Sequence, residues 1–382
     1  MKRLETIKRF GQGNEILDSK LLQIEERAGK GAADFVRQTV EGSYKNEVSS
    51  MFSPVSGLLR GVRNYQTTTK LDLAAVNNSM QGVNAVLAAD TASGYNALLK
   101  YKGGEAYRFA QQSGAISQNI MQSAMEMKTG GSGKMVTTAL KMYGFTATEN
   151  NNRVFSASVG KIYALRMSSR LAANPQDQLA IRALKELGVN PLSVLKAGSL
   201  NENEILRAGY NLSKVTQFGR EVTDLPLFWS TPEGKVLTQF KTFSYNQTIF
   251  LYNKIVGEAK QGNLVPLVKF LTYYGATGEL VGDIRSCITG VQRESNMFKR
   301  YIQNITYAGG LGLLGDSFSN MSYGRESALL ESVAGPTVGD ASAAFYNLTE
   351  LAKLNWKPLS KQLIQQVPLL KHPAKRVLFP KK

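Results

Sequence analysis

Hydrophobic residues recur along most of this sequence at intervals of three and four positions, which is the spacing of one face of a helix. Leu4, Ile7 and Phe10 near the start are an example. No run alternates apolar and polar residues beyond about five positions, so few or no strands are expected. The pattern predicts an all-α protein, an elongated assembly of many helices joined by short loops.

The stretch 224–260 carries the strongest helical pattern, and we expect the fold to be organised around it. Ser230 followed by Glu233 has the form of a capping box, and Pro232 suits the first turn of a helix. Apart from a single glycine, nothing between 235 and 260 disfavours a helix. The sequence therefore predicts one helix of about seven turns over these residues.

One face of this predicted helix is apolar and partly aromatic, and three interpretations of it stay open. It could be the buried face of a core helix, a surface that packs on partner chains, or a face that lies in a membrane interface. The face consists of Leu237, Phe240, Ser244, Thr248, Leu251 and Ile255. The candidates for packing against a partner or a membrane are Trp229, Phe240, Phe243 and Phe250.

Composition divides the chain into four regions. Residues 1–50 alternate charged and apolar positions, 51–141 are rich in Ala, Gln and Asn, 142–355 form a helical core region, and 356–382 form a basic tail with several prolines. The tail is expected to be extended. Helices of small residues bury little apolar area, so those of the second region need neighbours in the same chain or in other subunits.

Several short signals fix helix ends in the third region. Gly188 follows a helical run as a stop signal, and Asn190 with Pro191 has the form of a new start. The residues from Asn201 to Glu204 have the spacing of another cap. Pro266 is placed to open an apolar helix. The segment 129–138, in contrast, is rich in glycine and is predicted to be a flexible break.

The chain carries 46 Lys and Arg against 29 Asp and Glu, a formal net charge of +17. This excess attracts polyanions, either nucleic acid or an anionic lipid surface. The basic residues are spread out, which favours non-specific contact with phosphate over base reading. The candidates for such contacts are Lys235, Lys241, Lys254, Lys375, Arg376, Lys381 and Lys382.

The residue types that catalysis most often uses are scarce here. Cys287 is the only cysteine and His372 the only histidine, so neither a disulfide nor a metal site rich in these residues is expected. We interpret Cys287 as a small buried apolar residue. The glycine-rich segment 130–134 is not followed by the Ser or Thr that a phosphate-binding loop requires. The glycine-rich segment 310–315 is not preceded by the strand that a dinucleotide-binding site requires.

These observations predict a chain that is not an enzyme and that needs no cofactor, although a site made of carboxylates alone stays open. Glu149 and Arg153, four residues apart, are interpreted as a structural ion pair on a helix rather than a reactive one.

The N-terminal residues MKRLETIKRF lack the apolar run of a secretory signal. No window of 18 residues is both apolar and uncharged, so a permanent transmembrane helix is not expected. The sequence thus predicts synthesis in a cytoplasm.

Several segments follow one another in an order that resembles a known family. They are FTATENNNRVFSAS, then TQFGREVTDLPLFWSTPEGKVLTQFKTFSYNQTIFLYNKIVGE, NLVPLVKFLTYYGATGELVGD, AGGLGLLGDSF, VAGPTVGD and PLLKHP. The order is similar to the C-terminal region of the large polyvalent virion proteins of tailed bacteriophages and prophages. The residues that carry the resemblance are Glu149, Arg153, Thr216, Phe218, Pro226, Trp229, Pro232, Gly234, Gln239, Phe240, Lys241, Phe243, Gly335 and Pro336.

The resemblance implies an internal protein of the virion that is ejected with the DNA. Its expected partners are further copies of the chain or sister virion proteins, DNA bound without sequence preference, and the host membrane during ejection. Relatives often carry enzymatic modules upstream, and none is visible here, so no activity is expected to be inherited. The alternative is a peripheral protein that binds nucleic acid or membrane in the host cytoplasm.

Overall fold

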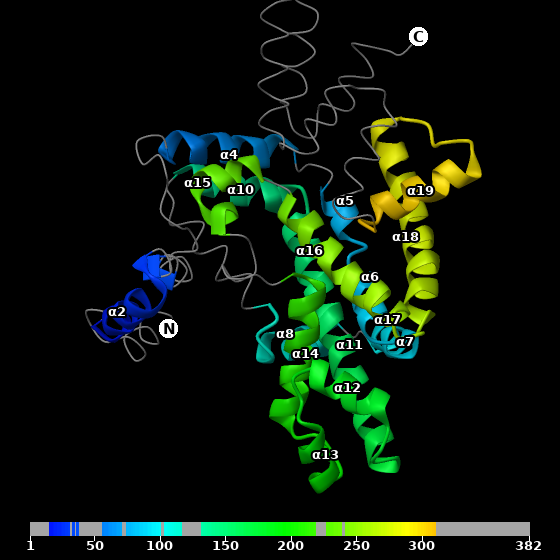
Figure 1. Cartoon of the computed structure of the whole chain (residues 1–382). Coiled ribbons are helices and arrows are strands. Elements are labelled where there is room, and N and C mark those ends of the chain that lie inside the picture. Colours follow the sequence, from blue (N-terminus) through cyan, green and yellow to red (C-terminus); the bar gives the residue numbers. More distant parts are fainter. Residues whose placement is uncertain are drawn as a thin grey trace, which may run out of the picture.

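The computed structural model of the chain describes residues 15–30, 33–34, 36–37, 56–70, 74–100, 103–116, 131–218, 227–238 and 241–310. Every regular element in these ranges is helical, and no β-strand occurs among them (Figure 1). The predicted all-α class is confirmed. The tail from 356, predicted to be extended, lies outside the described residues.

One long helix, α11 (Phe145–Ala173), lies at the centre of the packing. It contacts α5 (Ala74–Asn78), α7 (Thr91–Leu99), α8 (Gly103–Gln112), α10 (Gly131–Met142), α12 (Gln178–Glu186), α13 (Pro191–Ala197) and α14 (Glu202–Thr216). The expectation that the fold is organised around 224–260 is therefore wrong. The pattern of 145–173 is less amphipathic because neighbours cover this helix on several sides, so no single apolar stripe marks it.

The helices α11 and α14 cross closely because glycines meet at the crossing (Figure 1). A Cβ atom on Gly160 would lie 2.8 Å from the backbone oxygen of Ala208. A Cβ atom on Gly209 would lie 3.1 Å from the backbone oxygen of Ala157. The first distance is shorter than real Cβ contacts and the second is tighter than most, so glycine at these positions sets the spacing of the two backbones.

The small-residue helices of the second region find their neighbours within the chain. Ala85, Ala89 and Ala97 are buried in one core cluster with residues of α11, α12 and α14. Ala106 and Ala110 of α8 are buried in a second cluster that also includes Val154 of α11. Residues from both sides of the compositional boundary at 141 therefore share the same core.

The predicted ends of α12, α13 and α14 are present. Gly188 has a left-handed φ of +72°, and its N–H donates to the carbonyl of Lys185 as α12 ends. Asn190 caps α13, with Pro191 in the first turn. Asn201 and Glu204 form a reciprocal capping box at the start of α14.

From Lys241 to Ala259 the chain is one continuous helix with a π-helical turn, so the predicted single helix over 235–260 is wrong in that it is interrupted after Leu237. The described part of 224–260 contains several elements. They are a 3₁₀ turn (η3, Leu227–Ser230), α15 (Pro232–Leu237), α16 (Lys241–Leu251), a π-helical turn (η4, Tyr252–Val256) and α17 (Gly257–Ala259). Thr238 ends α15, and its hydroxyl donates to the carbonyl of Gly234 at 2.7 Å. Such a bond back to the preceding turn competes with the regular helix ladder.

The cap of α15 is Thr231 rather than Ser230. The Thr231 hydroxyl accepts a hydrogen bond from the Gly234 N–H at 3.0 Å. Pro232 explains the shift, because proline favours the first helical position and the residue before it is then the cap. The predicted capping box of Ser230 with Glu233 is thus one residue out of register.

The predicted flexible break at 129–138 is also wrong over its described part, since α10 begins at Gly131. The helix packs against α4 (Ser56–Lys70), which also contacts α15 (Figure 1). Ala139 is buried, and the hydroxyl of Tyr143, just after α10, donates to the Thr68 carbonyl at 2.6 Å. Apolar positions after Gly133 thus outweigh the glycines that suggested a break.

A third core cluster joins α6 (Val83–Ala88), α16, α18 (Val265–Thr289) and α19 (Met297–Tyr307). Its buried members include Leu87, Phe250 and Ile305. Pro266 lies in the first turn of α18, as predicted. A separate small cluster forms around α2 (Glu15–Ala28). In the ranges given above, no helix combines the length and apolar character needed to cross a bilayer.

A closed ring of hydrogen bonds is buried in this third cluster. Asn84 donates to the Gln247 side-chain oxygen at 3.0 Å, and Gln247 donates to the Tyr274 hydroxyl at 2.8 Å. The Tyr274 hydroxyl in turn donates to the side-chain oxygen of Asn84. Asn84 also donates to the Thr216 carbonyl at the end of α14. The ring therefore joins four helices through fully satisfied polar groups.

Candidate functional site

The lysines proposed for phosphate contact are engaged within the chain where the structure describes them. Lys254 forms an ion pair with Glu186 at 2.6 Å, and only 19% of its side chain is exposed. Lys235 and Lys241 are partly buried, and each makes an interaction within the chain. The four basic tail residues lie outside the described residues: Lys375, Arg376, Lys381 and Lys382.

The aromatic residues of the central stretch pack within the same chain, either in a core cluster or on another aromatic ring. Phe250 is buried in the third core cluster, so for this residue the core interpretation holds. Phe243 packs edge-to-face on Phe218 with ring centroids 5.5 Å apart. Trp229 lies against Tyr245 at 5.1 Å. Phe240, the fourth candidate, lies outside the described residues.

The predicted ion pair between Glu149 and Arg153 is formed, and it is more than a surface pair. The Arg153 side chain is only 4% exposed and lies 2.8 Å from Glu149. Glu149 also accepts from Asn78 of α5 at 3.2 Å. The pair therefore ties α11 to α5. Burial makes the loss of either partner costly, since the other charge would be left without compensation.

A cluster of four charged side chains joins α18 to α19 and the loop between them. The two helices approach closely because α18 presents Gly275 and Gly278 to α19, while Gly282 makes room for Arg293 of the connecting loop. A Cβ atom on Gly278 would overlap the backbone carbonyl of Asn304. This spacing leaves room for the side chains of Arg293 and Arg300 to reach back onto α18.

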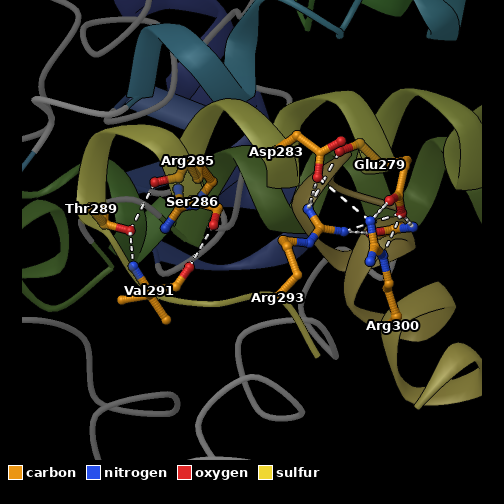
Figure 2. Close-up of polar contacts among 9 residues, drawn as sticks. Glu279, Asp283, Arg285, Ser286, Thr289, Val291, Arg293 and Arg300 are labelled. Atoms are coloured by element: carbon orange, nitrogen blue, oxygen red, sulfur yellow. Dashed lines mark hydrogen bonds and ion pairs between the residues drawn. The ribbon is translucent and has the colours of Figure 1, made fainter. Parts of the chain in front are cut away.

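Figure 2 shows Glu279 and Asp283 of α18 facing Arg293 and Arg300. Glu279 accepts from Arg300 Nε at 3.1 Å and from Arg293 Nη2 at 3.2 Å, and it also accepts from Asn304. The carboxylate of Asp283 lies 3.7 Å from Arg293 and 3.6 Å from Arg300. Two acids and two arginines thus lock the hairpin of α18 and α19, and their charges balance.

The hydrogen bond from Arg300 is the main reason that the pKa of Glu279 lies below its usual range. Burial opposes this effect, while Asn304 and Arg293 add to it. Arg293 and Arg285 also lie over the ring of Tyr307, 5.9 Å and 5.0 Å from its centroid. Arg293 is 12% exposed, so its charge depends on these neighbours rather than on water.

We expect Glu279→Gln to lower the thermal unfolding midpoint at neutral pH but not in acid. The fold favours the ionised carboxylate, so its contribution is complete at pH 7. That contribution declines as the pH falls below the ordinary carboxyl pKa of about 4 and through the lowered pKa of Glu279. Calorimetry of both proteins at pH 7 and at acid pH measures the difference.

The exposed Glu26 of α2 provides the matched control, because Glu26→Gln removes a charge without removing a described contact. Its midpoint should follow that of the unmodified chain at both pH values. The assignment of Glu279 as an ionised partner of Arg300 would be contradicted if the difference in unfolding midpoint between Glu279→Gln and the unmodified chain were as large in acid as at pH 7.

Beyond this lock, the loop end of the hairpin exposes large apolar side chains. Met297 is 87% exposed and Phe298 74% exposed at the start of α19. We call the following set the apolar hairpin tip: Ile284, Ile288, Val291, Met297 and Phe298. Cys287 is exposed on the same stretch of α18, so its interpretation as a buried residue is wrong. It lies away from the glycine face that packs on α19.

Sequence reasoning missed the hairpin as a site. A signal was present, since Gly275, Gly278 and Gly282 fall on one face of α18 at intervals of three and four. Of the arginines that use this space, Arg293 lies in the intervening loop and Arg300 on α19, and their partners cannot be assigned from spacing along the chain. Among the described residues, no group of His, Cys, Asp and Glu has the arrangement of a metal site.

Comparisons of the chain with protein-family models, with curated proteins and with solved structures found no match.

Proposed function

We propose that this chain is a structural component of a tailed bacteriophage particle, carried inside the capsid and ejected with the DNA. It acts by contact with further copies of itself or with sister virion proteins, and not by catalysis. The order of sequence segments between Phe145 and Pro373 supports the bacteriophage assignment. The all-helical architecture is compatible with it.

The apolar hairpin tip is the observation that carries the proposal of protein contacts. Met297 and Phe298 are large, adjacent and far more exposed than core residues, while the nearby Arg300 is held by Glu279 in the hairpin lock. Exposed apolar residues that gather in one place are typical of interaction sites. Met and Phe are also enriched in protein interfaces.

The net charge of +17 supports a location beside packed DNA. Lys and Arg reduce the repulsion between neighbouring phosphates without reading sequence. Exposed lysines are distributed over several helices, among them Lys185 and Lys299. A distributed charge of this kind suits non-specific contact better than a single binding groove.

Mass spectrometry of purified particles tests the location. Particles produced by induction of the host strain should contain several copies of the chain. Particles treated to release their DNA should lose the chain together with the DNA. Absence of the chain from the particles would overturn the proposal.

We expect the double substitution Met297→Ser with Phe298→Ser to weaken self-association of the purified chain about tenfold or more, because two large apolar side chains leave the interface. Light scattering after size-exclusion chromatography over a range of concentrations measures the effect. The matched control is Leu179→Ser with Leu192→Ser, which removes two exposed leucines from α12 and α13. Equal loss in both variants, or an unmodified chain that stays monomeric, would argue against the hairpin tip as the interface.

A further inference from the structure

The short helix α7 is apolar on the face that it exposes as well as on the face that it buries. Gly94 and Ala97 are buried toward the core. On the opposite side, Tyr95 is 61% exposed, and Leu98 and Leu99 are each 63% exposed. Large apolar side chains that gather on one exposed face are typical of interaction sites. This exposed set, Tyr95, Leu98 and Leu99, is called the α7 face below.

A basic pocket of about 390 Å³ lies beside the α7 face, between the end of α7 and α11. Three of its lining residues are cationic: Lys100, Arg166 and Arg170. Arg166 is held by Asp90 through Nη1 at 2.5 Å, and Arg170 is held by Asp177 at 2.7 Å. The two carboxylates therefore fix the guanidinium groups in place at the pocket wall.

Lys100 differs from the two arginines. It caps the C-terminal end of α7, is exposed, and has no ion-pair partner in the part of the chain that the structure describes. Leu165 and Ile162 of α11 supply the apolar part of the pocket wall. The pocket thus combines one uncompensated ammonium group, two fixed guanidinium groups and an apolar rim that continues onto the α7 face.

We propose that the α7 face and the basic pocket form a docking site for the surface of an anionic phospholipid bilayer. Tyr95, Leu98 and Leu99 enter the boundary between headgroups and acyl chains, where an aromatic ring with a polar end and aliphatic side chains are both stable. Lys100, with the outer edges of Arg166 and Arg170, contacts the lipid phosphate.

Charge and composition favour a membrane over nucleic acid as the occupant. Nucleic acid offers phosphate but no apolar phase, so it would leave Leu98 and Leu99 in water. A bilayer satisfies both halves of the site, and the net charge of +17 attracts the chain to an anionic surface. The inference deepens the proposed function by naming a lipid partner, and it rests on that function only for its biological setting.

Flotation of the purified full chain with vesicles tests the site. The chain should float with vesicles of phosphatidylcholine mixed with phosphatidylglycerol and much less with phosphatidylcholine alone. The variant Leu98→Ser with Leu99→Ser should bind about tenfold or more weakly, because two leucines no longer leave water. Lys100→Gln should reduce binding to the anionic vesicles and make it less sensitive to salt.

Matched controls lie on α13, where Leu192 is 63% exposed, as Leu98 is, and Lys196 is also exposed. The variants Leu192→Ser with Leu195→Ser, and Lys196→Gln, should bind vesicles as the unmodified chain does. Circular dichroism and thermal melting of all variants establish that each is folded.

Three results would overturn the inference: no flotation with anionic vesicles, equal losses in the α7 and α13 variants, or unchanged flotation of the α7 variants. If Lys100→Gln weakens the retardation of short duplex DNA but leaves vesicle binding unchanged, the pocket is assigned to nucleic acid instead. Because vesicles contain no virion proteins, failure here leaves the presence of the chain in particles to be decided by mass spectrometry.

Discussion

Replacing Gly278 by alanine is expected to lower the free energy of unfolding by about 3 kcal/mol or more. This is one of the two largest effects that we expect from a single substitution. The new Cβ atom would overlap the backbone carbonyl of Asn304, which no side-chain rotation can move. The helix α19 must shift away from α18. Arg300 would then lose its hydrogen bonds to Glu279.

Chemical denaturation followed by circular dichroism measures this effect. The control is Gly61→Ala in the interior of α4, where a Cβ atom would meet nothing within 4 Å. There the same substitution is expected to stabilise the chain by about 0.5–1 kcal/mol, because alanine favours the helix. If Gly278→Ala behaved like Gly61→Ala, the close approach of α18 and α19 described above would be incorrect.

Asn84→Ala is expected to cost about 3 kcal/mol, because it leaves several buried polar groups without partners. The Tyr274 hydroxyl loses its acceptor, and Gln247 loses the side chain that it pairs with. Both residues are almost fully buried, so water cannot replace the missing bonds. Burial also raises the pKa of Tyr274, which keeps its hydroxyl protonated and able to donate.

A double-mutant cycle separates the ring from simple loss of volume. Tyr274→Phe alone removes one hydroxyl and should cost less than Asn84→Ala, and the combined variant should cost less than the sum of both. The exposed Asn203 of α14 is the control, since Asn203→Ala breaks no contact described above. Additive costs in the cycle would mean that the three side chains do not act as one network.

Local signals in the sequence predicted helix ends well. The capping box of Asn201 with Glu204 and the start at Asn190 and Pro191 depend on residues three or fewer positions apart. Their chemistry is decided within one turn of helix, so distant residues hardly change it. Where two such signals competed, as Ser230 and Pro232 did, the stricter backbone requirement of proline determined the register.

Contacts between residues that lie far apart in the sequence could not be predicted in this way. Asn84 and Tyr274 are 190 positions apart, and nothing in either neighbourhood marks the other as its partner. The central place of α11 was missed for a related reason. A helix covered on several sides has no single apolar stripe, so the periodicity that identified 224–260 does not mark it.

The candidate site was predicted least well. Aromatic and basic residues of the central stretch suggested an outward role, but Phe250 is part of the core and Lys254 is paired with Glu186. Among the most exposed large apolar residues of the described ranges are Leu98 and Leu99 on α7 and Met297 and Phe298 at the hairpin tip, which the sequence did not single out. Whether an apolar side chain is covered depends on the tertiary neighbours of its helix, which the periodicity of a single segment does not specify.

The exposed position of Cys287 on α18 gives the chain a natural handle for labelling. It is the only cysteine in the 382 residues, so a maleimide dye or a nitroxide would attach at one defined place without any engineered substitution. The label would sit between Ile284 and Ile288, close to the apolar hairpin tip. Its emission or spectral line shape would therefore report whether that surface becomes covered when the chain meets a partner.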